Sequence, residues 1–179
     1  MARFRKFLGV IIVASSSIVI PVIFPSPAAA QTSVEAVCLG AGEETYTPGL
    51  TNEKRAVTTV TAAETTCAPP GGSPAKVASF RFSYTFERSC TDTKFGGGNL
   101  PIDWGSGETS TVNFGAITVR AVGAAREVLL LGTMIDGMFQ GAAVAIKLTL
   151  LAADFVACGT SDGVGSATGP AAIAVNRIL

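Results

Sequence analysis

The sequence has no histidine, one tryptophan and two tyrosines, and charged residues make up only 15% of the chain. Without an imidazole it lacks the usual proton shuttle at neutral pH and every catalytic triad that depends on histidine. Patterns typical of a serine nucleophile elbow or a dinucleotide-binding loop are also missing. The four cysteines are widely spaced and form no C-x-x-C pair, so no metal or cofactor is expected. These absences favour a non-catalytic role.

The first thirty residues have the three parts of a cleavable export signal. Three cations among the first six residues precede an apolar run at 7–24, and three alanines at 28–30 form a small-residue cleavage pattern. An uncleaved anchor is the alternative, because eighteen residues approach the shortest membrane span. Serines and prolines in the run favour cleavage. We therefore expect residues 1–30 to be a signal peptide and residues 31–179 a single secreted domain without a stable membrane span.

Charge and length limit the partners of the predicted mature chain. Removing three cations leaves ten Lys and Arg against thirteen Asp and Glu, a net charge of about −3. The cations mostly stand alone, so a nucleic-acid partner is not expected. The remaining 149 residues (179 minus 30) suffice for one domain with its own core. We expect a monomer, and the residues leave a protein, a glycan or a small apolar ligand open as the partner.

All four cysteines lie in the predicted secreted part. An even number of cysteines in an oxidising compartment indicates two disulfides, for which three pairings are formally open. We favour Cys38 with Cys67 and Cys90 with Cys158. The first bridge would join an N-terminal pair of strands, and the second would tie the middle of the chain to its end.

Alternation of apolar and polar residues predicts antiparallel strands. From Phe80 to Phe86 every second residue is aromatic and the residues between are polar, which is typical of a strand buried on one face. Ala and Leu make a helix the alternative at 142–154, but the alternation there favours a strand. Further strands are predicted around 55–61, 102–104, 110–114, 117–121, 128–131, 144–150 and 171–178.

Turn signals separate these segments and limit the fold class. Asp136-Gly137 lies between two apolar stretches and predicts a hairpin whose return strand starts at Phe139. Eight to ten short strands with turns at this spacing predict an all-β fold. We expect an antiparallel β-sandwich, immunoglobulin-like, with a partly closed barrel as the alternative.

Five residues are candidates for contact with a ligand or partner. Asp103 and Glu108 flank a turn and could form the carboxylate pair of a glycosidase, although solvated acids at a hairpin tip are favoured. Trp104 could offer a platform for a sugar or a partner, although a core position is favoured. Phe82 and Tyr84 could line a pocket for an apolar ligand, although core packing is favoured. The acids Glu43, Glu44, Asp154 and Asp162 are interpreted as loop charges without a calcium site.

Several local signatures occur together: Tyr46 to Thr51 (YTPGLT), Ile102-Asp103-Trp104, a G-x-x-x-x-G-x-F-x-G pattern from Gly132 to Gly141, and Ala157-Cys158. With these signatures the chain resembles a group of small secreted actinobacterial proteins of unassigned function over nearly all of residues 34–178. The resemblance implies a signal peptide, four cysteines and an all-β domain, and no functional residue.

Together these features predict a secreted, non-catalytic module that binds at the cell surface or in the medium, using loops on a rigid scaffold. A carrier of a small apolar ligand between the sheets is the second hypothesis. A carbohydrate-active enzyme is the third.

Overall fold

A computed structural model describes residues 32–68, 76–105, 107–123 and 125–178. The predicted signal peptide and a Pro/Gly-rich segment at 69–74 lie outside the described residues. The secondary-structure elements are β1 (Thr32–Leu50), β2 (Arg55–Ala68), β3 (Lys76–Arg88), β4 (Lys94–Asp103), β5 (Thr109–Val122), β6 (Ala125–Gly137), β7 (Ala143–Leu151), the 3-10 helix η1 (Ala152–Gly159) and β8 (Val164–Ile178).

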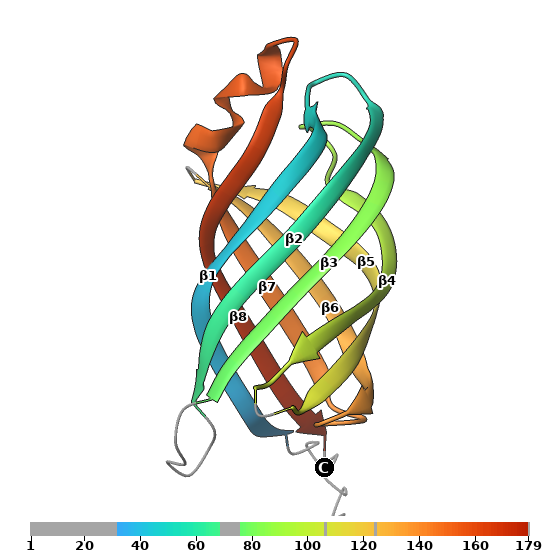
Figure 1. The fold of residues 1–179 in the computed structure, drawn as a ribbon, viewed down its shortest axis with the longest axis vertical. Helices are drawn as coiled ribbons and strands as arrows, with labels where there is room; N and C mark the ends of the chain where they lie inside the picture. Colours follow the sequence, from blue (N-terminus) through green and yellow to red (C-terminus); the bar gives the residue numbers. More distant parts are fainter. Residues whose placement is uncertain (1–31, 69–75, 106, 124, 179) are drawn as a thin grey trace, which may run out of the picture.

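The strands form one closed antiparallel barrel (Figure 1). Each strand pairs with the next along the chain, and β8 pairs back with β1. The prediction of an antiparallel all-β fold is confirmed. The preferred sandwich is wrong, because β8 pairs with β1 and the strands form one continuous wall instead of two packed sheets. Each strand buries alternate residues in either architecture, so the alternation alone does not distinguish them.

Closure depends on the length of β1. Its nineteen residues pair with β2 on one edge, from Val37 to Thr47, and with β8 on the other, from Thr32 to Leu50. Both edges of β1 are hydrogen-bonded to a neighbouring strand, so β1 leaves no open edge in the sheet. An eight-stranded barrel has an interior just wide enough for side chains to fill. The large fully buried apolar residues are Leu50, Leu100, Ile102, Trp104, Ile117, Leu130, Met134, Ile146, Leu148, Leu150 and Ile173.

Both predicted disulfides are confirmed. Cys38 is bonded to Cys67, joining β1 to β2, and Cys90 is bonded to Cys158, joining the β3–β4 loop to η1. Among the described residues, no helix is long and apolar enough to cross a membrane.

Two local predictions need correction. The strand predicted at 142–154 is confirmed up to Leu151, and the chain then turns into η1, whose Phe155 is buried against the end of the barrel. The return strand of the hairpin does not start at Phe139. Strand β6 continues to Gly137, and Phe139 lies in a wider turn with a φ of 62°. Gly137, at φ 77°, lies so close to β5 that a Cβ would be 2.0 Å from the carbonyl oxygen of Thr109.

Candidate functional site

The wall of the barrel is weakest between β3 and β4. Among the described residues, the only ladder pair joining these strands is Ser79 with Asp103, whereas every other pair of neighbours is in register over six or more residue pairs. Nine residues of each strand, 80–88 and 94–102, therefore run past each other without backbone pairing. At about 3.3 Å per residue this stretch is about 30 Å long. We call it the β3–β4 seam.

Aromatic side chains fill the seam where the backbone does not close it. Tyr84 stacks on Phe82 with ring centroids 5.3 Å apart and on Phe95 of β4 at 5.9 Å, and Phe82 meets Phe114 of β5 edge-on at 6.0 Å. These distances are within the range of favourable aromatic pairs. Phe82, Tyr84, Phe86 and Phe95 remain half-buried, while Phe114 is buried. The seam is therefore an aromatic surface partly open to solvent.

Gly96 of β4 makes room for one of these rings. A Cβ on Gly96 would lie 2.6 Å from Cζ of Phe86, closer than two such carbon atoms can approach. A glycine inside a strand often marks such a close approach. The ring of Phe86 thus lies over the backbone of β4 and covers this part of the seam.

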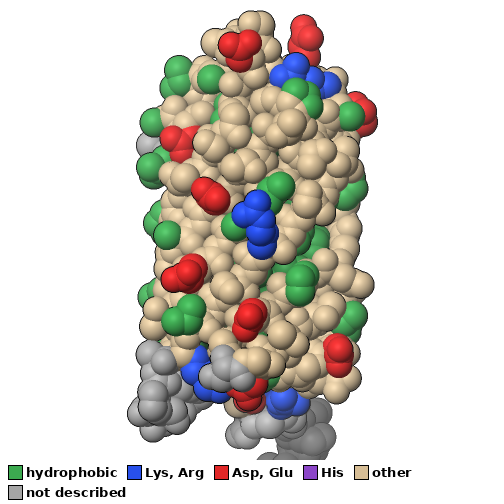
Figure 2. Space-filling model, in the orientation of Figure 1, with side chains coloured by type: hydrophobic (Ala, Val, Ile, Leu, Met, Phe, Trp, Pro, Cys, Tyr) green, Lys and Arg blue, Asp and Glu red, His purple; other side chains and the backbone are tan. Residues whose placement is uncertain are grey.

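A groove opens where β3 and β4 diverge. It has a volume of about 280 Å³ and lies between residues 79–81 of β3 and 101–103 of β4. Phe80 and Ile102, which line it, are buried. Its volume is close to the lower limit of typical small-ligand pockets. In the orientation of Figure 1, hydrophobic and charged side chains are both scattered over the visible face of the barrel (Figure 2).

A larger groove, of about 610 Å³, crosses the outer wall over β8, β1 and β2. It is shallow, and its lining consists of small residues, such as Gly42 and Ala62, with the exposed acids Glu43 and Glu64. Aromatic side chains and buried polar groups, which give a pocket affinity and orientation, are missing from this lining. We therefore place the candidate site at the β3–β4 seam.

A buried polar cluster lies behind the aromatic rings. The carboxylate of Glu44, only 1% exposed, accepts hydrogen bonds from the hydroxyls of Tyr46 (2.7 Å), Thr61 (3.1 Å) and Tyr84 (3.3 Å). A buried carboxylate needs such donors to offset its loss of hydration. Tyr84 belongs both to this cluster and to the seam, so it connects the two.

Arg88 completes the cluster at the end of β3. It is 3% exposed, and its Nη1 donates to Oγ1 of Thr59 (2.6 Å) and to the hydroxyl of Tyr84 (3.2 Å). The guanidinium carbon lies 3.9 Å from the ring centroid of Phe95, a close cation–π contact. Its Nε is buried without a hydrogen-bond partner among the described residues.

Burial shifts the titration of both tyrosines. It raises the pKa of Tyr46 and that of Tyr84, and the neighbouring charge of Glu44 adds to both increases, whereas Arg88 opposes them. Burial also lowers the pKa of Arg126. The phenols are therefore held neutral well above their usual range.

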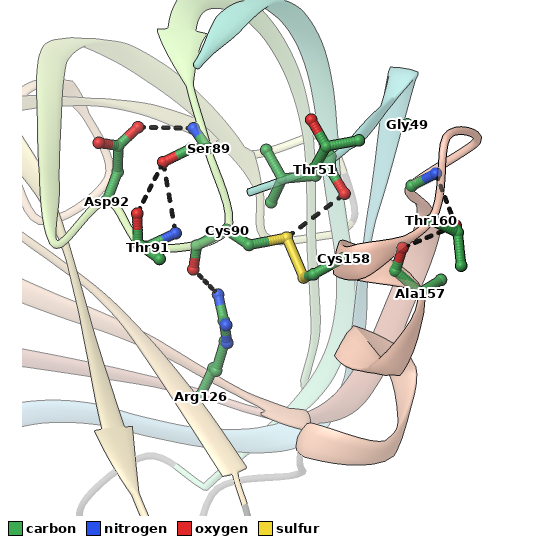
Figure 3. Close-up of a disulfide and its surroundings, with 12 residues drawn as sticks. Gly49, Thr51, Ser89, Cys90, Thr91, Asp92, Arg126, Ala157, Cys158 and Thr160 are labelled. Atoms are coloured by element: carbon green, nitrogen blue, oxygen red, sulfur yellow. Dashed lines mark hydrogen bonds between the residues drawn. A yellow bond between two sulfur atoms is a disulfide. The ribbon is translucent and has the colours of Figure 1, made fainter. Parts of the chain in front are cut away.

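The barrel end beside the cluster is closed by η1. Figure 3 shows the disulfide between Cys90 and Cys158, with the side chain of Arg126 donating to the carbonyl of Cys90. The guanidinium carbon of Arg126 also lies 4.2 Å from the ring centroid of Phe155, which η1 inserts into the barrel end. A cavity of about 10 Å³, room for one water molecule, remains between Phe155, Arg126 and the polar cluster.

The structure brings together only part of the candidate residues. Phe82 and Tyr84 line the seam, and Asp103 borders its groove. The carboxylate of Asp103 accepts from the backbone N–H of Gly105 (2.8 Å), as expected of a turn, while Glu108 pairs with Lys76 at 2.6 Å.

Trp104 is a core residue and offers no platform at the surface. It is 2% exposed, its Nε1 donates to Oγ of Ser110 (2.9 Å), and its ring meets Phe139 edge-on at 5.1 Å. The favoured core interpretation is confirmed.

The sequence interpretation missed Glu44, Arg88 and Phe95. Interpreting Glu44 as a loop charge was wrong, because it lies in β1 with its side chain inside the barrel. Adjacent strand residues face opposite sides, so one acid of the Glu43-Glu44 pair had to point inward. The same period places Arg88 on the face of the aromatic stripe, two residues after Phe86.

Among the described residues, no group of three or more His, Cys, Asp and Glu side chains is arranged to hold a metal ion. No protein-family model matches the chain, and the comparisons with curated proteins and with solved structures found no match.

Proposed function

We propose that the protein is an exported, non-catalytic binding module that holds a small, planar, apolar molecule at the β3–β4 seam. The observation that carries this proposal is the break in the barrel wall, where a single ladder pair joins β3 and β4 and half-buried aromatic rings take the place of further pairing. A ligand would enter from the side, between two strands, and lie against Phe82, Tyr84 and Phe95.

Aromatic faces suit a planar ligand for a physical reason. Ring stacking adds about 0.5–1.5 kcal/mol per pair beyond the burial of apolar area. Rotation of half-buried rings exposes more of this surface without breaking a backbone hydrogen bond, because the seam carries so few. The remaining wall of the barrel is paired along its length and provides the rigid frame that a binding site needs.

Export is supported by two features. The chain has both disulfides expected of an oxidising compartment, and the described residues leave no free cysteine. The N-terminal sequence has the pattern of a signal peptide.

A catalytic role for the acids near the seam is less favoured. Glu108 is engaged by Lys76 and Asp103 by its own turn. Neither acid is buried, whereas a glycosidase needs one carboxyl group with a raised pKa facing another across the substrate.

Fluorescence titration with N-phenyl-1-naphthylamine, a neutral probe that carries two planar aromatic groups, tests the proposal. We expect saturable binding, weakened about tenfold by Phe95→Ala, since the loss of one aromatic contact with its buried area is about 1.4 kcal/mol. Leu131→Ala is the matched control, because Leu131 is 60% exposed on β6. Equal effects of the two substitutions, or no binding by the wild-type chain, would contradict the proposal.

A further inference from the structure

Arg88, the last residue of β3, places a buried positive charge at one end of the seam, on the same face of the strand as the aromatic rings. Arg88 follows Phe82, Tyr84 and Phe86 at the same two-residue spacing, so its side chain points into the barrel as theirs do. Its guanidinium contacts Phe95 and the hydroxyl of Tyr84. A molecule lying against these two rings is therefore within reach of Arg88.

In the part of the chain that the structure describes, the guanidinium of Arg88 is not paired with a carboxylate. Among the described residues Arg88 forms no ion pair, and its hydrogen-bond acceptors are the neutral oxygens of Thr59 and Tyr84. Its Nε, although buried, lacks an acceptor in the same set of residues. Buried guanidinium groups are normally paired with an anion, because an unpaired charge is costly in the interior.

Glu44 does not supply that pairing. It belongs to the same cluster, but both of its oxygens accept from hydroxyl groups. Arg126 borders the same small cavity and adds a second cation, while Asp92 is engaged by the backbone N–H of Ser89 and lies 3.8 Å from Lys54. The cavity is thus lined by two cations, Arg88 and Arg126, and by two acids, Glu44 and Asp92, and neither acid forms an ion pair with Arg88.

From this arrangement we infer that the ligand is a planar apolar molecule with one anionic group, and that Arg88 binds this group while Tyr84 and Phe95 hold the apolar body. The inference rests on the proposed function and adds the charge of the ligand. A carboxylate placed beside the guanidinium would accept a charge-assisted hydrogen bond from the unpartnered Nε.

Displacement of N-phenyl-1-naphthylamine by 2-naphthoate and by 2-naphthamide tests the inference, because these competitors share shape and apolar area and differ in charge. In the wild-type chain we expect 2-naphthoate to compete about tenfold or more better than the amide. Arg88→Met is expected to abolish this preference, so that the folded variant binds the acid and the amide about equally. Arg88→Lys, which keeps the charge, is expected to retain part of the preference. Lys147→Gln is the matched control, because Lys147 is a cation whose side chain is 48% exposed on β7, a strand that neighbours neither β3 nor β4.

The outcomes separate the two proposals. Equal competition by the acid and the amide in the wild-type chain overturns the inference even if Arg88→Met fails to fold. A preference that survives in folded Arg88→Met also overturns it, because another cation then binds the acid. Absence of binding by the neutral probe contradicts the proposed function itself.

Discussion

Alkaline titration of the two tyrosines tests the buried polar cluster behind the seam. Tyr46 and Tyr84 are the only tyrosines in the chain, so phenolate absorbance reports on the cluster alone. Burial and the charge of Glu44 raise the pKa of both phenols in the folded protein, whereas in the unfolded chain they ionise near pH 10. Above pH 10 the unfolded state therefore holds fewer protons, and the free energy of unfolding falls as pH rises.

The magnitude follows from linkage. At pH 11, one unit above the ordinary pKa, each tyrosine that stays neutral in the folded state lowers the free energy of unfolding by about 1.4 kcal/mol, and the pair by about 3 kcal/mol. Below pH 9 this contribution vanishes, because the phenols are neutral in both states. Tyr84→Phe is expected to halve the loss between pH 9 and pH 11, which separates the tyrosines from lysines that titrate in the same range.

Two measurements check this prediction. Phenolate absorbance near 295 nm is expected to stay absent from the folded protein through pH 11 and to appear together with unfolding, monitored by circular dichroism. Urea unfolding at pH 9 and pH 11 gives the change in stability. Phenolate absorbance that rises with a midpoint near pH 10 in a protein still folded would refute the buried cluster.

Three further predictions concern the stability of the fold. Trp104→Phe is expected to lower the free energy of unfolding by about 1–2 kcal/mol, because the indole hydrogen bond is lost, and no change in urea unfolding would contradict this. Gly96→Ala is expected to destabilise the fold by about 1–3 kcal/mol, and by clearly less in a Phe86→Ala background; additive effects would show that the two residues do not touch. Replacing Cys90 and Cys158 by alanine is expected to cost about 4 kcal/mol, given their separation of 68 residues, as measured by thermal unfolding.

The strands could largely be predicted from the sequence, because each buries alternate residues on one face. The stripe from Phe80 to Phe86 was found in this way. The disulfide pairings were favoured on a separate argument, that one bridge joins two N-terminal strands and the other ties the middle of the chain to its end, and both are confirmed. Closure into a barrel could not be predicted, since it depends on β1 pairing with β8, more than a hundred residues away. No local pattern distinguishes that pairing from the packing of two sheets.

The candidate site could be predicted only in part. Phe82 and Tyr84 were recognised from the alternation. Their position along an unpaired seam depends on the divergence of β3 from β4, which is a tertiary feature. Glu44 was assigned to a loop because paired acids are usually solvated. Its burial is explained by the hydroxyl groups that two other strands bring to it, and local sequence does not show these partners.

The most direct test of the central claim is a two-dimensional ¹H–¹⁵N NMR titration of the folded protein with N-phenyl-1-naphthylamine. If the ligand binds at the seam, the largest shift changes will fall on residues 80–88 and 94–102. Changes confined to the outer wall over β8, β1 and β2, or no change at saturating probe, would contradict the account.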